Sequence, residues 1–282
     1  MISCPTVHRS VIRSHYDLTT VFYRLLWGPH IHHGLWEGSE SPRTAQQHLT
    51  ETLSRHAGLC GGERVLDVGC GMGGSSIHLA RKLGCRVTGI TVSPLQRRWA
   101  TLSAMGRRVS RLTDFQCVDA EQVEFSPETF DVVWSIECTE HLFDKEAFFR
   151  RAAEWLRPGG RMAICAWLAG DSLDSEDAVR QVYDVCEGFF CPSLGTGDDY
   201  QGWMSAAGLV PTAYEDWTDR VWRTWEICRQ RVARTGMRRI ARWIDPNMLL
   251  FLDRFETILR AYQTGAMRYG CFIAHKAEDP PR

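Results

Sequence analysis

Short runs of apolar residues alternate with amphipathic stretches from Arg64 onward. Val65, Leu66 and Val68 form the first run, and apolar side chains recur at helical spacing in the stretch that follows. Apolar runs of this length, bounded by turn residues, are typical of strands buried on both faces of a parallel sheet. The repeated strand–helix order predicts an α/β fold, in which right-handed crossovers give a doubly wound sheet.

The same patterning predicts helices outside this alternation. Residues 15–27 form an amphipathic helix after a few loose residues, and Ser41-Pro42 starts a second helix that Gly58 ends. An aromatic-rich insertion follows Gly170, and lid helices are predicted at about 220–243 and 246–262. We therefore expect a helical cap at residues 1–60 and a main domain at 61–282 that includes a lid insertion at about 171–265.

Composition narrows the class of protein. The 282 residues contain 33 Lys plus Arg against 34 Asp plus Glu, so charge gives no general attraction to nucleic acid or to an anionic membrane. The eleven cysteines include no CxxC pair, and Cys85, Cys117 and Cys165 fall in predicted buried strands, which indicates reduced core residues. The chain shows no secretory signal and no apolar run of membrane-spanning length. We expect a cytoplasmic protein that acts on a small molecule.

A glycine-rich turn follows the first strand. Gly69, Gly71 and Gly73 permit positive φ and close backbone approach to a ligand, and the helix that follows aims free amide groups at the same place. This geometry suits a charged nucleoside cofactor. Gly69, Gly71 and Gly74 also satisfy the G-x-G-x-x-G pattern of dinucleotide-binding folds, but the next strand ends at Thr91 without the acid that a nicotinamide enzyme places on the ribose. A nicotinamide cofactor is therefore disfavoured.

Five motifs follow one another along the chain. They are VLDVGCGMGG, GITVSPLQ, Asp119-Ala120 after a third strand, FDVVWSIECTEH on the fourth strand and LRPGG before the fifth. With these five motifs the chain resembles a class I S-adenosylmethionine-dependent methyltransferase. Segments such as WGPHIHHG and CEGFFCP make it most similar to the tocopherol O-methyltransferase type, with sterol and cyclopropane-lipid methyltransferases as more distant relatives. The resemblance spans about residues 15–276. It implies a Rossmann-like seven-stranded sheet whose last strand, at 267–275, runs antiparallel.

The resemblance also implies a set of residues that bind S-adenosylmethionine, which becomes S-adenosylhomocysteine. Asp67 and the glycine turn would meet the methionine portion, and burying Asp67 is costly unless it is paired, although it could instead cap a turn. Asp119 resembles the acid that accepts from the adenine amino group. The remaining donor contacts are expected from Thr91, Ser93 and Gln96 at the ribose, with Ser93 also capping a helix, and from Ala120, Ser135, Tyr16, Trp36 and Gln46.

His141 is the candidate base. It follows the fourth strand, and its unperturbed pKa near ~6.5 suits proton removal at neutral pH. Glu140 could orient His141 or bind a ligand itself. A histidine that caps the following helix or packs under the lid is the structural alternative.

Aromatic and imidazole side chains are expected to surround the acceptor. This set consists of Tyr23, Trp27, His32, His33, Trp167, Phe189 and Phe190, which could equally be lid core. His30, His32 and His33 lack a Cys, Asp or Glu at ligand spacing, so we expect no metal. Eight arginines between residues 220 and 242 face one acid, Glu226, and are interpreted as the rim of a lid helix that makes at most weak membrane contact.

These observations predict a methyltransferase for a small hydrophobic acceptor, aromatic or isoprenoid-like, methylated on oxygen. Methylation of carbon or nitrogen on the same fold is one alternative. The lid determines which acceptor is bound, and its sequence indicates only that the lid is rich in aromatic residues. A protein that binds S-adenosylmethionine without turnover is another. Oligomeric state is left open.

Overall fold

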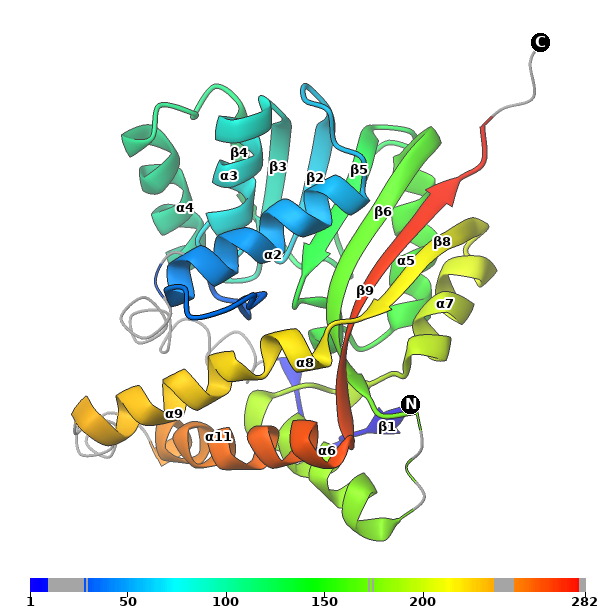
Figure 1. Ribbon diagram of the computed structural model, residues 1–282. Helices are drawn as coiled ribbons and strands as arrows, with labels where there is room; N and C mark the ends of the chain where they lie inside the picture. Colours follow the sequence, from blue (N-terminus) through cyan, green and yellow to red (C-terminus); the bar gives the residue numbers. More distant parts are fainter. Residues whose placement is uncertain (10–27, 29, 172, 174, 236–245, 279–282) are drawn as a thin grey trace.

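A seven-stranded sheet forms the centre of the computed structural model, which describes residues 1–9, 28, 30–171, 173, 175–235 and 246–278 (Figure 1). Its strand order is β4-β3-β2-β5-β6-β9-β8. The five strands from β4 to β6 are parallel, and β9 is antiparallel to both neighbours. The strands are β2 (Arg64–Val68), β3 (Arg86–Thr91), β4 (Thr113–Cys117), β5 (Phe130–Ile136), β6 (Leu156–Ala169), β8 (Leu209–Asp216) and β9 (Met267–Lys276). This confirms the α/β fold and the antiparallel last strand.

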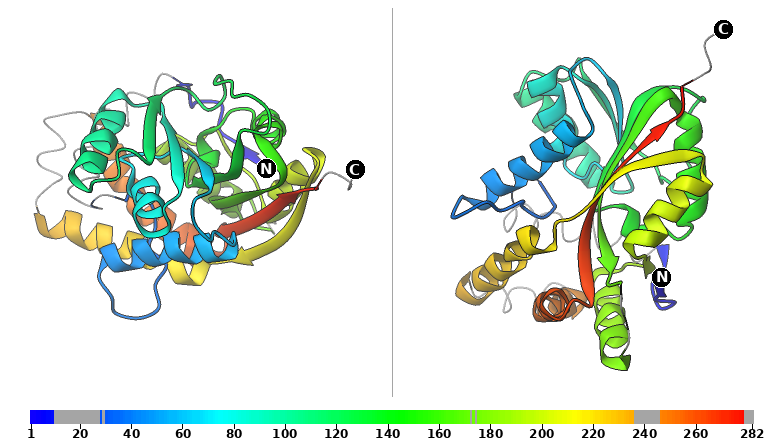
Figure 2. Two further views of the ribbon diagram at one scale, coloured as in Figure 1. Left: turned by 90° about the horizontal axis from the view of Figure 1, so that it is seen from above. Right: turned by 45° about the vertical axis from the view of Figure 1, so that its right-hand side comes forward.

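Helices cover both faces of the sheet (Figure 2). On one face lie α2 (Pro42–His56), α3 (Gly74–Leu83) and α4 (Pro94–Gly106), and on the other α5 (Lys145–Trp155) and α7 (Gly197–Ala206). Each face has its own hydrophobic core. The central strands read as uninterrupted apolar runs because both faces are covered, so that Val65, Leu66 and Val68 are all fully buried.

Two helix starts follow their predicted capping chemistry. The side chain of Ser41 accepts a hydrogen bond from the backbone N–H of Thr44, with Pro42 as the first residue of α2. Ser93 caps α4 in the same way by accepting from the backbone N–H of Gln96. Both helices are thereby fixed where their first turns approach the carboxyl ends of the parallel strands.

The lid helices lie beyond those carboxyl ends (Figure 1). They are α6 (Glu176–Phe189), α8 (Thr218–Val221), α9 (Arg223–Thr235) and α11 (Pro246–Thr264), and α11 packs against α6 and α9. The helix expected at 246–262 is confirmed. The helix expected at 220–243 starts as α8 and α9, and its last part lies outside the described residues, as does the cap helix expected at 15–27.

Three details differ from the sequence expectations. The seventh strand, β8, falls within the range assigned to the lid, and Pro211 and a register shift beside it obscure its alternation. The first residues are not all loose, because β1 (Ile2–Ser3) pairs antiparallel with β7 (Ser193–Leu194). Cys117 is exposed rather than buried, because β4 is an edge strand. Among the described residues, no helix has both the length and the apolar character needed to cross a membrane.

Candidate active site

The glycine turn sits between β2 and α3. Gly69, Gly71 and Gly73 have φ of +75°, +53° and +79°. A Cβ on Gly69 would lie 2.4 Å from the side chain of Cys138, so the loop after β5 presses directly on the turn. Only glycine satisfies both requirements at position 69.

Asp67 lies beneath this turn rather than on an open surface. It is 2% exposed, and its carboxylate accepts a hydrogen bond of 2.5 Å from the hydroxyl of Ser76. Burial raises the pKa of Asp67 to about 6, and the bonds from Ser76 oppose that rise. The carboxylate is therefore held at the base of the turn at an energetic cost, which an opposite charge would offset.

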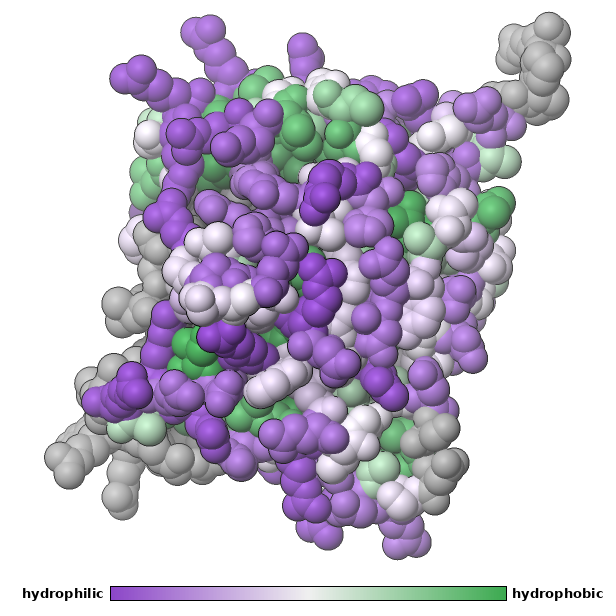
Figure 3. Space-filling view, viewed as in Figure 1, coloured by the Kyte–Doolittle hydropathy of each residue, from purple (hydrophilic) through white to green (hydrophobic). Residues whose placement is uncertain are grey.

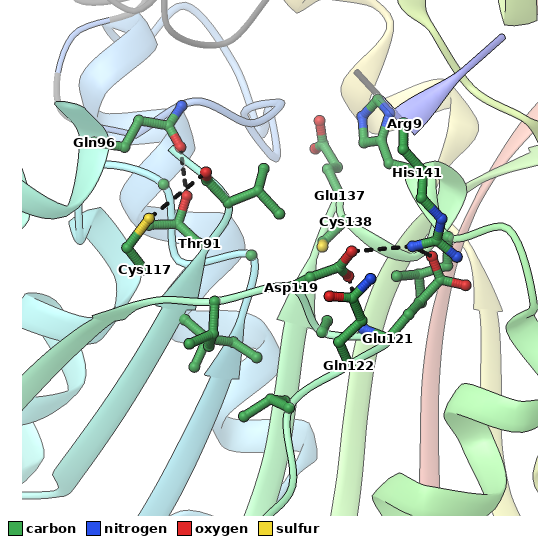
Figure 4. Close-up of a pocket in the computed structure, with 18 of the residues that line it drawn as sticks. Arg9, Thr91, Gln96, Cys117, Asp119, Glu121, Gln122, Glu137, Cys138 and His141 are labelled. Atoms are coloured by element: carbon green, nitrogen blue, oxygen red, sulfur yellow. Dashed lines mark hydrogen bonds and ion pairs between the residues drawn. The ribbon is translucent and has the colours of Figure 1, made fainter. Parts of the chain in front are cut away.

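A cavity of about 620 Å³ opens at the carboxyl ends of the parallel strands. Seven of the predicted site residues line it, namely Gly69, Gly71, Thr91, Gln96, Asp119, Ala120 and His141. Thr91 and Gln96 lie on one side of the opening and His141 on the other (Figure 4). The structure thus brings together residues from four separate stretches of the chain.

Polar groups line both sides of the cavity (Figure 4). The hydroxyl of Thr91 donates to Oε1 of Gln96 at 2.8 Å. Asp119 accepts from the backbone N–H of Glu121 at 2.8 Å, and its other oxygen pairs with Arg9 at 3.0 Å. Arg9 also contacts Glu121 at 2.7 Å and lies over the ring of Phe143. Arg9 was missed by sequence analysis because it belongs to a stretch with no helical or strand pattern.

Glu137 was also missed, although it directly follows β5. It has a φ of +54°, an uncommon conformation outside glycine that points to a functional or packing constraint. One oxygen accepts from the backbone N–H of His33 at 2.7 Å and from the hydroxyl of Tyr269 at 2.8 Å. Burial acts to raise the pKa of Glu137, but His33 and His32 outweigh it and hold the pKa at about 2. An acid one position past a buried strand was the available signal.

Glu140 and His141 form the short turn η1 (Thr139–His141). The carboxylate of Glu140 accepts from the backbone N–H of Trp167 at 3.0 Å, and burial raises its pKa to about 8. Nδ1 of His141 lies 3.1 Å from the carbonyl oxygen of Phe190, and burial lowers its pKa to about 4. Within the described residues no hydrogen bond joins the two side chains, so Glu140 holds β6 and not the imidazole.

A family model described as mycolic acid cyclopropane synthetase matches residues 5–178, which is more than half of the chain. The chain belongs to this family of S-adenosylmethionine-dependent methyltransferases. Among its curated relatives is the 27-O-demethylrifamycin SV methyltransferase of Amycolatopsis mediterranei, which is 33% identical over 77% of this chain and 79% of the relative. The chloroplastic tocopherol O-methyltransferase of Arabidopsis thaliana is 29% identical over 95% of this chain and 82% of its own.

Solved structures agree on the fold of the methyltransferase. The 4+2 cyclase SpnF superposes with a TM-score of 0.86 at 24% identity, covering 99% of this chain and all of its own. A geranyl diphosphate C-methyltransferase from Streptomyces coelicolor A3(2), solved with Mg²⁺, geranyl diphosphate and S-adenosylhomocysteine, has a TM-score of 0.73 at 20% identity, covering 95% and 97%. The two neighbours differ in the reactions that they are named for, so they inform the fold and not the acceptor.

The cavity fits the S-adenosylmethionine that the methyltransferase uses. It combines a turn at which a Cβ would clash, hydroxyl and amide groups, and a carboxylate at the far wall. Four of the predicted donor residues beside the turn, Asp67, Gly73, Ser93 and Ser135, do not line the cavity. Gly73 caps α3, and Ser135 donates to the carbonyl of Val68 at 3.2 Å, so that both support the turn from below.

The predicted residues of the cap hold the segment that carries the histidines. The side-chain amide of Gln46 donates to the carbonyls of His30 and His32 at 2.9 and 3.3 Å, and Trp36 donates to the hydroxyl of Thr224 at 3.1 Å. Neither residue lines the donor cavity. Tyr16, Tyr23 and Trp27 lie outside the described residues.

The predicted acceptor residues form a packed aromatic cluster. Nε1 of Trp225 donates to Nε2 of His33 at 2.6 Å, and the ring of Trp167 lies 5.3 Å from that of Phe189. His32 bonds with His30 at 3.1 Å, and Phe190 contributes the carbonyl that meets His141. Within the described chain no group of three or more His, Cys, Asp or Glu is placed to hold a metal ion.

The described part of the arginine-rich lid segment agrees with its interpretation as a lid helix with arginines at its rim. Trp225 is buried, whereas Arg220 and Arg229 are at least 40% exposed and pair with Glu37 and Glu256. Arg223 lies over the ring of Trp36 and so ties the lid to the cap.

Proposed function

We propose that this methyltransferase methylates an oxygen atom of a small hydrophobic acceptor, aromatic or isoprenoid-like, with His141 as the base. Bound S-adenosylmethionine supplies an electrophilic methyl group on a sulfonium sulfur. The glycine turn and Asp67 would hold its methionine portion, Thr91 and Gln96 its ribose, and Asp119 with Ala120 its adenine. Ser93 and Ser135 support this set from the helix start and from the strand.

The observation that carries the proposal is the environment of His141. Its Nδ1 meets the carbonyl of Phe190, and since a carbonyl only accepts, the N–H stands on Nδ1. Nε2 is then the basic nitrogen of a ring that lines the donor cavity. Burial lowers the pKa of His141 to about 4, so the imidazole is neutral at pH 7 and can accept a proton, but as a weaker base than the unperturbed histidine that the sequence suggested.

Glu140 acts as a positioning residue in this proposal. It fixes the turn that carries His141 through the backbone of Trp167, and Lys145 donates to the carbonyls of Glu140 and Leu142 at 3.4 and 2.8 Å. A base held by contacts on both sides of its turn keeps its ring in one orientation, which favours reaction at a placed acceptor.

The names of two relatives support oxygen as the atom methylated, since both describe O-linked methylation. His33, Trp167 and Phe189 pack together, and His33 contacts Glu137, which lines the cavity; this aromatic cluster would exclude water from an apolar acceptor. Methylation of carbon is the alternative, since the geranyl diphosphate C-methyltransferase with the same fold is named for that reaction. A cytoplasmic location and at most weak membrane contact by the lid stay predictions.

The test compares His141→Ala and His141→Gln with wild type in single-turnover methyl transfer. We expect a loss of roughly 10²–10⁴-fold in rate with unchanged affinity for S-adenosylhomocysteine, and partial rescue of His141→Ala by added imidazole. His56→Ala is the matched control, because His56 pairs with Glu215 on the outside of α2. An unchanged rate in both His141 variants would remove His141 as the base.

A further inference from the structure

A second cavity, of about 70 Å³, lies between α2, α3 and α4. Its lining is basic, with Arg43 from α2, Arg81 and Lys82 from α3, and Arg107 immediately after α4. It shares no lining residue with the donor cavity, although Gly74 at the start of α3 contributes to its wall. The two cavities are therefore separate.

No acidic side chain is among the described residues that line this second cavity. Arg43, Arg81 and Lys82 form no ion pair with any part of the chain that the structure describes. Glu51 contacts His78, another lining residue, at 3.5 Å. Cations that line one cavity repel one another, and an anion bound among them would offset that repulsion.

His30 also lines the second cavity. It is only 5% exposed, its Nδ1 lies 3.1 Å from Nε2 of His32, and its own Nε2 has no hydrogen-bond partner in the described chain. Burial lowers the pKa of His30, and nearby positive charges, including Arg107 and Arg43, lower it further. His30 thus adds to the lining an imidazole nitrogen that no described group contacts, and a ligand in the cavity would supply that contact.

We propose that this cavity binds a phosphate group, carried either by a small phosphorylated molecule or by a lipid headgroup. Guanidinium groups bind phosphate oxygens through paired N–H donors, and a lysine adds a point charge, so Arg43, Arg81, Arg107 and Lys82 supply both kinds of contact. The hydroxyl of Ser103, also in the lining, adds a neutral donor.

A lipid headgroup would need an apolar surface beside the cavity, whereas a soluble phosphate would not. Most of the face that carries α2 is hydrophilic, as Figure 3 shows. On α4, however, Trp99, Leu102 and Met105 are 39%, 62% and 59% exposed. An apolar helix face next to a basic cavity suits a lipid surface, whereas the cavity alone suits a soluble phosphate.

The experiment titrates inorganic pyrophosphate into the methyltransferase saturated with S-adenosylhomocysteine, and in parallel measures sedimentation with phosphatidylglycerol and phosphatidylcholine vesicles. Arg81→Gln with Lys82→Gln, and separately Arg43→Gln, should weaken binding by roughly tenfold or more for each lost cation. Arg64→Gln with Arg260→Gln is the matched control, since it also removes two exposed positive charges. Circular dichroism verifies that every variant is folded.

Each outcome decides the proposal. Pyrophosphate binding that the cavity variants lose and the control keeps supports a soluble ligand. Variant-sensitive sedimentation with phosphatidylglycerol alone supports a lipid headgroup. The proposal is overturned if neither probe binds, if the control weakens binding as much as the cavity variants, or if saturating S-adenosylhomocysteine abolishes the binding seen without it. That last result would make the cavity an extension of the donor site.

Discussion

Oε2 of Glu137 lies 3.0 Å from Nδ1 of His33, and both side chains are at most 7% exposed. The pair joins the end of β5 to the segment that precedes α2, so it connects the donor-binding sheet to the cap. Tyr269 and Trp225 extend it into β9 and the lid. The buried contact between Glu137, which lines the cavity, and His33 thus joins the sheet, the cap, β9 and the lid.

Glu137→Gln tests this link through stability. The folded-state pKa of about 2 lies below an unfolded value near ~4.3, so the ionised carboxylate stabilises the fold above the unfolded pKa, and this contribution is lost as pH falls toward 2. We expect Glu137→Gln to lower the free energy of unfolding by about 3 kcal/mol at pH 7. The difference from wild type should shrink below pH 5. Urea unfolding at pH 7, 5 and 4 measures it.

Glu124→Gln is the control for that series, because Glu124 is 82% exposed. A Glu137→Gln variant as stable as Glu124→Gln at pH 7 would show that the buried pair contributes nothing.

Gly69→Ala separates backbone conformation from close packing. Gly69 and Gly62 both have positive φ, but a Cβ on Gly62 meets nothing within 4 Å, whereas one on Gly69 meets Cys138 at 2.4 Å. Gly62→Ala should cost about 1–2 kcal/mol from its dihedral angle alone. Gly69→Ala should cost about 1–3 kcal/mol more and weaken donor binding, because the turn must move. Thermal unfolding and calorimetric titration with S-adenosylhomocysteine compare them, and equal losses would rule out the packing constraint.

We expect Asp67→Asn to stabilise the fold and to weaken binding of the methyl donor. The folded-state pKa of about 6 exceeds the ordinary aspartate value of 3.8, so the wild type loses stability as pH rises from about 4 to 6 and the asparagine variant does not. Without ligand at pH 7 the variant should be more stable by on the order of 1–3 kcal/mol. It should also bind S-adenosylhomocysteine more weakly.

Asp114→Asn controls for the loss of one charge, because Asp114 is exposed on β4. If Asp67→Asn is less stable than wild type at pH 7 and binds the ligand as well, the carboxylate only supports the turn.

The sheet and its donor motifs could be predicted because they depend on local rules. Apolar runs, glycines at positive φ and serine caps such as Ser93 each fix their own geometry. Arg9 could not be predicted from patterning, and the position of Glu137 just past β5 was its only signal, since the roles of both arise from contacts with residues more than 100 positions away. The aromatic residues Trp167 and Phe189 were grouped correctly, yet only packing shows that they contact each other rather than line the donor cavity.

The most direct test of the proposed function is transfer from S-adenosylmethionine with a ¹³C-labelled methyl group to a panel of phenols, isoprenoids, sugars and alkaloid amines, read by NMR of the products. We predict label on an oxygen of an apolar acceptor, with little or none on sugars or amines. Label found only on carbon or nitrogen, or no transfer to any acceptor by enzyme that binds S-adenosylhomocysteine, would contradict the proposed reaction.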